Sequence, residues 1–186
     1  MVGSVSDLES LVPSWRLSLQ AANKSKATIT SYTYATTQFA AYLRDHGMPS
    51  DVTAITREYV ESFLRDLIES RSASTAETRY RGLRQFFGWA EDEGEITRSP
   101  MAKMKPPAVA EQPVDVPSVE DLQALLAVCG TNDFEGRRDT AIIRLFLDSG
   151  LRLAELTGLT MDALDLGAGM VGVTGKGDRY RTASFG

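Results

Sequence analysis

The sequence has very little cysteine and histidine: among its 186 residues, Cys129 is the one cysteine and His46 the one histidine. A single cysteine excludes an internal disulfide and is typical of a protein of the reducing cytosol. One cysteine and one histidine also cannot build a zinc site or a Cys–His nucleophile pair, so no metal site is expected.

Long apolar runs are missing as well. No stretch approaches the roughly 18 consecutive apolar residues that a membrane span requires. The opening segment, Met1 to Leu11, contains Asp7 and Glu9 and no basic region, so no secretory signal is expected. Apolar residues make up 42% of the chain and charged residues 24%, a composition that is ordinary for globular proteins and excludes wholesale disorder.

The net charge of −5 argues mildly against nucleic acid as a partner. The charge is unevenly spread, however: residues 1–110 hold 13 basic and 13 acidic side chains, whereas residues 111–186 hold 7 basic and 12 acidic ones. Local patches rather than the net charge decide nucleic-acid binding, so this class of partner stays open.

Proline divides the chain. Five of the seven prolines fall between Ser99 and Ser118, and such a density stops helices and produces a semi-extended connector. We therefore expect a domain at residues 1–98, a linker at 99–117 and a second domain at 118–186. In the first domain, apolar residues at helical spacing predict four helices, one with Pro13 at its start or at a kink and others beginning near Lys26, after Thr56 and near Thr75.

The second domain has a mixed pattern. Ser118 can cap a helix whose apolar stripe includes Cys129, which we expect in the core. Residues 139–148 are apolar nearly all round and predict a buried central helix that ends at Gly150. A short helix is expected at 153–159, and residues 170–185 predict a β-hairpin. The expected fold class is an all-α bundle followed by a partial, mixed α/β domain.

Arg152 is the first candidate for chemistry. It follows the helix-ending Gly150 and opens the next helix, and Glu155 lies three residues on, where a carboxylate can hold the guanidinium. An arginine oriented in this way is well placed to bind a phosphate bidentately. The alternative is a surface arginine in a local ion pair.

Lys176 is the second candidate, at the tip of the predicted hairpin between Gly175 and Gly177. The glycines permit a tight turn and a close approach to a ligand. An ammonium group there can serve as an acid or as an electrostatic clamp. The alternative is an ordinary solvated turn.

A possible nucleic-acid surface is the third candidate. It combines the start of the helix near Lys26 with the face of the helix after Thr75 that lies opposite its aromatic stripe. Its members are Lys24, Lys26, Thr28, Thr78, Arg81, Arg84 and Gln85. Arg79 lies nearer the apolar side and is expected in a structural ion pair. The alternative is a solvated face of an amphipathic helix.

The order of these pieces resembles the tyrosine recombinase (phage integrase) family over almost the whole chain. Trp89-Ala90 followed by the pattern Gly94-x-Ile96-x-x-x-Pro100 is similar to the end of the family's core DNA-binding domain. Gly150-Leu151-Arg152-x-x-Glu155-Leu156 resembles its first catalytic-arginine motif, and Gly175-Lys176-Gly177 resembles its catalytic-lysine turn.

The resemblance implies a role for each of these residues. Arg152 contacts the scissile DNA phosphate, Glu155 supports that arginine, and Lys176 is the general acid on the leaving 5′-hydroxyl. The family's reaction is attack by a tyrosine on a phosphodiester to give a 3′-phosphotyrosyl link. That link stores the bond energy, so no cofactor and no obligatory metal is implied. The implied partner is double-stranded DNA. The resemblance also implies that the full-length protein self-associates into a synaptic tetramer and that its location is cytoplasmic.

The resemblance is incomplete. The family continues with a His/Lys-x-x-Arg motif, a further His or Trp, and the tyrosine nucleophile, and none of these has a match here; Tyr180, in the hairpin, does not fit the nucleophile's context. We therefore expect an integrase fragment that binds DNA but is inactive in strand cleavage. The alternatives are a non-catalytic DNA-binding regulator on the same scaffold and a helical protein-interaction module.

Overall fold

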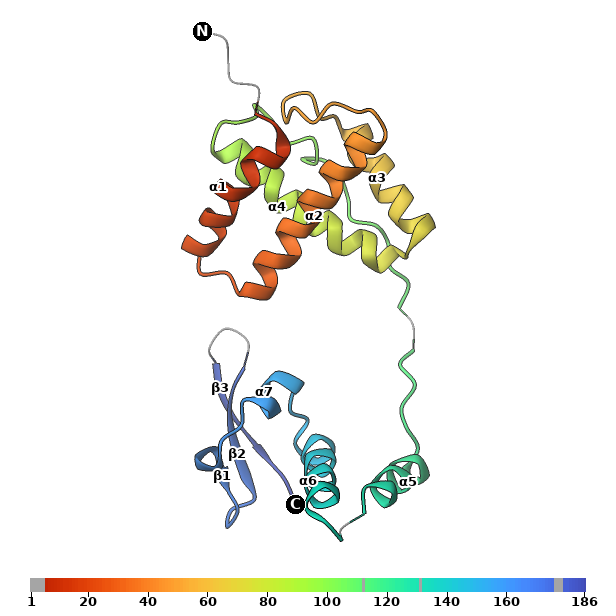
Figure 1. Ribbon diagram of the computed structural model, residues 1–186, viewed down its shortest axis with the longest axis vertical. Helices are drawn as coiled ribbons and strands as arrows, with labels where there is room; N and C mark the ends of the chain where they lie inside the picture. Colours follow the sequence, from red (N-terminus) through yellow and green to blue (C-terminus); the bar gives the residue numbers. More distant parts are fainter. Residues whose placement is uncertain (1–5, 112, 131, 176–178) are drawn as a thin grey trace. The chain divides into compact units, whose positions relative to one another are not determined.

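The fold is taken from a computed structural model, which describes residues 6–111, 113–130, 132–175 and 179–186. The chain forms two units, Met1–Gln112 and Pro113–Gly186. The first is all-helical and the second combines helices with a small antiparallel sheet (Figure 1). This confirms the fold class that the sequence predicts. No helix within the described ranges has both the length and the apolar character that crossing a membrane requires.

Four helices build the first unit, as predicted: α1 (Leu8–Ala21), α2 (Lys26–Asp45), α3 (Arg57–Ser70) and α4 (Ala73–Asp92). The side chains of Asp7, Ser25 and Ser72 each accept a backbone N–H at the start of a helix, which satisfies donors that the helix leaves free. One detail differs from expectation: Thr56 precedes α3 but makes no side-chain cap bond. Of the two positions expected for Pro13, at the start of the helix or at a kink within it, the structure excludes the first, because Pro13 lies inside α1.

Aromatic side chains fill the core of this unit. The rings of Trp15 and Phe86 meet edge to face with centroids 5.1 Å apart, and Phe39 packs on Phe63 at 5.2 Å, separations at which aromatic pairs attract. Gly82 lets α4 approach α2 closely, since a Cβ at that position would lie 2.7 Å from the Cβ of Ala35. The core therefore holds α2 and α4 side by side. The faces of these two helices that point away from the core stay exposed to solvent.

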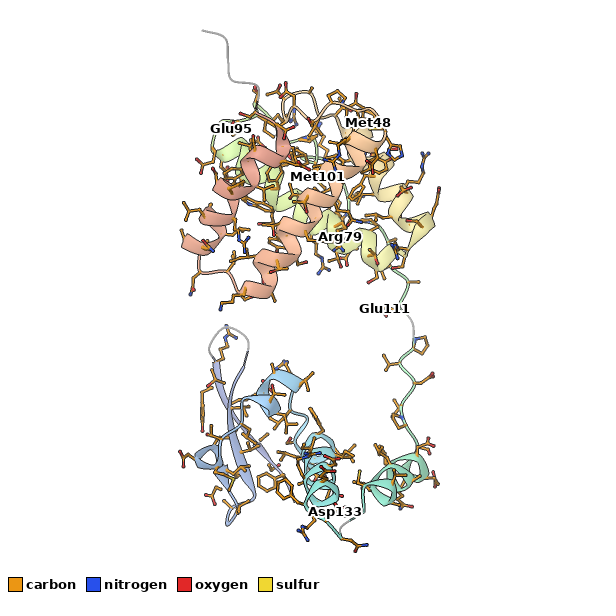
Figure 2. All side chains as sticks on the ribbon, in the orientation of Figure 1. Met48, Arg79, Glu95, Met101, Glu111 and Asp133 are labelled. Atoms are coloured by element: carbon orange, nitrogen blue, oxygen red, sulfur yellow. The ribbon has the colours of Figure 1, made fainter. Side chains whose placement is uncertain are left out.

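The first unit also includes the beginning of the predicted linker. Met101 and Met104 are buried in the helical core, and Figure 2 shows Met101 among the helices. The buried hydroxyl of Tyr80 donates to the Met104 carbonyl at 2.6 Å. From Ala108 to Ser118, by contrast, every residue that the structure describes is exposed. Apolar burial thus extends the packed unit beyond residue 98 and leaves a shorter exposed connector.

The second unit contains a small meander. Its elements are α5 (Val119–Cys129), α6 (Phe134–Ser149), α7 (Leu153–Thr157), the 3₁₀ helix η1 (Met161–Ala163), β1 (Leu164–Asp165), β2 (Met170–Gly175) and β3 (Arg179–Ser184). The strands pair antiparallel in the order β1-β2-β3. The predicted hairpin is therefore confirmed, with one short strand added. Leu151, Val171 and Val173 form its buried core.

The prediction of a buried central helix at 139–148 is wrong. Gly136 is the one buried residue of α6, while Ile142 and Leu147 are exposed. The core cluster reaches only one side of α6, through Leu145, and an apolar pattern cannot tell how many elements are present to cover a helix. For the same reason α5 has no buried residue, and Cys129 on it is half-buried rather than in the core.

Limited proteolysis with glutamyl endopeptidase tests whether the segment from Ala108 to Ser118 is an exposed connector. Glu111 lies in the connector and is exposed, and exposed backbone between packed units is the preferred site of proteolysis. The first cut should fall after Glu111 and release the packed helical unit, as read by mass spectrometry of the early fragments. Glu111→Gln should delay that cut. A first cut at Glu77, inside α4, would contradict this division of the chain.

Candidate functional site

Arg152 lies at the junction of two helices. Gly150 ends α6 in the left-handed conformation, at φ 59°, which glycine adopts without the steric cost that a Cβ brings. Leu151 then enters the core and Arg152 is the N-cap residue of α7. The Arg152 side chain is 68% exposed. The local backbone thus buries the residue before Arg152 and presents the guanidinium to solvent.

Glu155 anchors this arginine, as the spacing of the two residues predicts. Its carboxylate oxygen Oε1 accepts a bond from Arg152 Nη1 at 2.9 Å, and Oε2 accepts one from the Arg152 backbone N–H at 2.8 Å. The Glu155 side chain is only 3% exposed. Bonds at both ends of Arg152 fix the position of its guanidinium, which leaves fewer rotamers to be lost when a ligand binds.

Arg181 completes the cluster, and the sequence interpretation missed it. Its Nη2 donates to Glu155 Oε2 at 2.8 Å. The register of the hairpin shows its position: Arg181 is the direct cross-strand partner of Val173, so it shares the face of the hairpin that Val173 buries. A charged side chain on the buried face of the hairpin requires a partner of opposite charge. Glu155 is that partner.

The surroundings of Glu155 lower its pKa to about 2, from an ordinary value of 4.5. The hydrogen bond from Arg181 is the largest cause, followed by the bond from the Arg152 backbone N–H, and burial opposes both. A carboxylate that receives several hydrogen bonds in its charged form resists protonation. Glu155 is therefore ionised throughout the neutral range and holds both arginines.

Lys176, the second predicted catalytic residue, lies outside the described residues. Its neighbour Gly175 is described and packs directly on the arginine cluster, since a Cβ there would lie 2.9 Å from Glu155 Oε1. The hairpin strand that leads to Lys176 thus passes against the Glu155 carboxylate. Tyr180 is the cross-strand partner of Thr174, and successive strand residues point to opposite faces, so its ring lies on the other face of the hairpin from Arg181.

The residues predicted to face nucleic acid are all in the first unit. All but the half-buried Thr28 are exposed; they lie at the start of α2 and along α4, two helices that pack together. Within the described ranges, no hydrogen bond joins the α2 group to the α4 group. The geometry therefore gives two neighbouring polar and basic segments on adjacent helices.

Three arginines of α4 have different surroundings. Arg81 pairs with Glu77, one turn earlier on the same helix. Arg84 Nη1 donates to the Tyr80 hydroxyl at 2.9 Å and approaches the Met104 carbonyl at 3.5 Å, contacts that hold its exposed side chain in place. Arg79, labelled in Figure 2, corrects an expectation. It makes no ion pair with a described residue; its Nε donates to Gln38 at 2.6 Å, and its guanidinium lies over the Tyr34 ring.

Comparison with known proteins identifies the family. Residues 11–94 match the family described as "Phage integrase, N-terminal SAM-like domain". A tyrosine recombinase XerD of Lacticaseibacillus casei is 32% identical over 160 residues, which cover 84% of this chain and 53% of that protein. A tyrosine recombinase XerC of Chlorobaculum tepidum is 31% identical over 186 residues, covering 88% of this chain and 55% of that protein.

Solved structures share the fold. A lambda integrase dimer bound to a COC′ core site matches with a TM-score of 0.74 at 15% identity, over 96% of this chain and 49% of that one. The XerH site-specific recombinase bound to a palindromic difH substrate matches with a TM-score of 0.68 at 18% identity, over 94% and 52%. The chain belongs to the tyrosine recombinase, or phage integrase, family. It spans about half the length of the curated relatives it matches.

The lowered pKa of Glu155 predicts how acid affects this unit. The folded state binds the Glu155 proton only near pH 2, whereas the unfolded chain binds it near pH 4.5. The stability that Glu155 contributes is therefore complete above about pH 4.5 and is lost as the pH falls from there toward about 2. Urea unfolding followed by the NMR signals of Val171 and Val173, repeated across this range, measures the loss.

Two variants control this experiment. Glu155→Gln should lack this component of the acid destabilisation and should be less stable than the parent at neutral pH. Glu135→Gln removes an exposed carboxylate from α6 and should follow the parent. Parallel pH curves for the parent and Glu155→Gln would show that the bonds to Arg152 and Arg181 do not hold the carboxylate in its charged form.

Proposed function

We propose that this chain takes part in site-specific DNA recombination as a DNA-binding fragment with part of a strand-cleavage site. The observation that carries the proposal is Arg152, exposed to solvent yet anchored at both its backbone and its guanidinium by the buried Glu155. This arrangement suits a ligand that is anionic and tetrahedral, because a guanidinium can bind two oxygens of a phosphate at once.

Duplex DNA is the proposed substrate. The exposed residues on α2 and α4 supply positive charge and hydrogen-bond donors for phosphates and base edges. The family relationship supports this choice, because the matched lambda integrase and XerH structures are complexes with DNA. We further propose that the full-length protein assembles into a tetramer in the cytoplasm; a lambda integrase tetramer bound to a Holliday junction has the same fold.

The proposed chemistry is transfer of a phosphodiester to tyrosine. A tyrosine hydroxyl loses its proton to solvent as its oxygen attacks phosphorus, the bond to the 5′-oxygen breaks, and a 3′-phosphotyrosine forms. Arg152 stabilises the negative charge on the nonbridging oxygens, and Lys176 gives its proton to the departing 5′-oxygen. Phosphoryl transfer depends mainly on positioning and on charge stabilisation, which arginine and lysine can supply. The 186 residues contain no match to the family's nucleophile motif.

DNA binding is tested by salt dependence. Affinity for a labelled duplex should fall steeply between low and moderate salt, because phosphate contacts release counterions from DNA. Arg84→Glu should weaken binding at all sequences and reduce the salt slope by about 1. Arg137→Glu, which reverses an exposed arginine on α6, is the matched control and should change little. Binding that is absent at low salt, or that ignores salt, would exclude the proposed DNA surface.

Strand cleavage is tested with a nicked substrate that traps covalent intermediates. This chain should give no protein–DNA adduct on a denaturing gel, because charge stabilisation has no effect without a nucleophile to attack the phosphorus. The XerD recombinase of Lacticaseibacillus casei on its own recombination site serves as the positive control. An adduct formed by the chain itself, mapped to any of its tyrosines, would contradict the prediction.

A further inference from the structure

Arg152, Glu155 and Arg181 form one cluster with unequal charge. Two guanidinium groups meet a single carboxylate, and each lies within 2.9 Å of it. The cluster therefore carries a net charge of +1 at neutral pH. Arg152 and Glu155 alone would be a neutral pair, and a neutral pair attracts a monoanion far less than a cluster with one excess positive charge.

We propose that Arg181 is a positioning residue: it binds Glu155 from the sheet and thereby keeps the exposed Arg152 available to a phosphodiester. The inference rests on the proposed role of Arg152 in binding DNA phosphate. In this arrangement the carboxylate divides its charge between two partners. Arg181 acts through Glu155, and the phosphodiester binds at Arg152.

The two arginines of the cluster differ in how much of their side chains is exposed to solvent. Glu155 is 3% exposed and Arg181 is 38% exposed, whereas Arg152 is 68% exposed. The carboxylate is thus enclosed, one of its guanidinium partners is held mostly inside the unit, and the other faces solvent. An anion from solution reaches the exposed Arg152 first. Glu155 and Arg181, which are more enclosed, therefore set the charge of the cluster, and Arg152 binds the anion.

Two further contacts fix Arg181 in place. Its Nη2 also approaches the Gly150 carbonyl, at the end of α6, at 3.5 Å, and pairing across the hairpin sets it opposite Val173. Gly175 closes the cluster from the neighbouring strand, because a side chain there would collide with Glu155 Oε1. The side chain of Arg181 therefore connects the hairpin with the segment that positions Arg152.

The test is a titration with dimethyl phosphate, a monoanion with the chemistry of a DNA phosphodiester. The side-chain Nε–H resonance of Arg152, assigned by its loss in Arg152→Lys, reports binding, with sodium chloride added to hold ionic strength constant. The resonance should shift and saturate in the parent chain. In Arg181→Gln the apparent dissociation constant should rise about tenfold, the scale on which a lost charge-assisted contact acts.

Matched variants separate charge from folding. Arg179→Gln removes an exposed arginine from the same strand and should titrate like the parent. Arg181→Lys retains the charge and should keep part of the response. The double variant Glu155→Gln, Arg181→Gln should regain the response, because a neutral residue 155 no longer needs a second cation. A purely structural role for Arg181 predicts no such recovery.

Each outcome is decisive. An unchanged titration in Arg181→Gln, with the parent responding, would overturn the role of Arg181 and leave the phosphate role of Arg152 intact. If Arg181→Gln disturbs the Val171 and Val173 signals, failure of the double variant to recover would also overturn the role. Absence of any Arg152 response in the parent chain would overturn both, whereas binding of duplex through the first unit would still be judged by the Arg84 experiment.

Discussion

The arrangement of the second unit depends on the hydrogen bonds that the Glu155 carboxylate accepts. Through its three bonds it joins the start of α7 to strand β3. Gly175, on β2, packs against the same carboxylate. The apolar core beside it is small, with Leu151, Val171 and Val173 as its buried members. In a unit with so little buried apolar surface, an enclosed and fully bonded carboxylate has a large share in fixing how the hairpin meets the helices.

The first unit is organised by a different force. Its helices enclose an aromatic and aliphatic core, and a glycine at the closest approach of α2 and α4 allows the two backbones to come together. Such packing stabilises the unit mainly through apolar contacts, and a few polar bonds, such as that of Tyr80 to the Met104 carbonyl, add to it. The exposed arginines of α2 and α4 are not part of this core, but they make surface contacts: Arg44 pairs with Glu9 of α1, Arg81 with Glu77, and Arg84 bonds to Tyr80 and approaches the Met104 carbonyl.

Much of this could be predicted from the sequence, for reasons that lie in individual residues. Helical periodicity located α1 to α4, and the glycine-rich turn between two β-rich runs located the hairpin. The bond between Arg152 and Glu155 followed from their i, i+3 spacing. The exposure of α6 could not be predicted. An apolar pattern shows which side chains of a helix could be buried, but it does not show which neighbouring elements are there to bury them. Arg181 was missed because its partner lies 26 residues away in sequence, and only the register of the hairpin shows that it faces the buried side.

The distribution of charge along the chain explains how a protein with a net charge of −5 can belong to a family of DNA recombinases. The first unit is nearly neutral as a whole, so long-range attraction to DNA depends on where its cations lie and not on their number. The second unit carries the excess acid, and at ordinary ionic strength charges more than about 8–10 Å apart are largely screened. A phosphate at the site proposed for Arg152 would therefore respond mainly to nearby charges, among them the local excess of one positive charge that Arg152, Glu155 and Arg181 create. Acidic side chains elsewhere in the unit would lower the overall affinity for DNA without cancelling this proposed site.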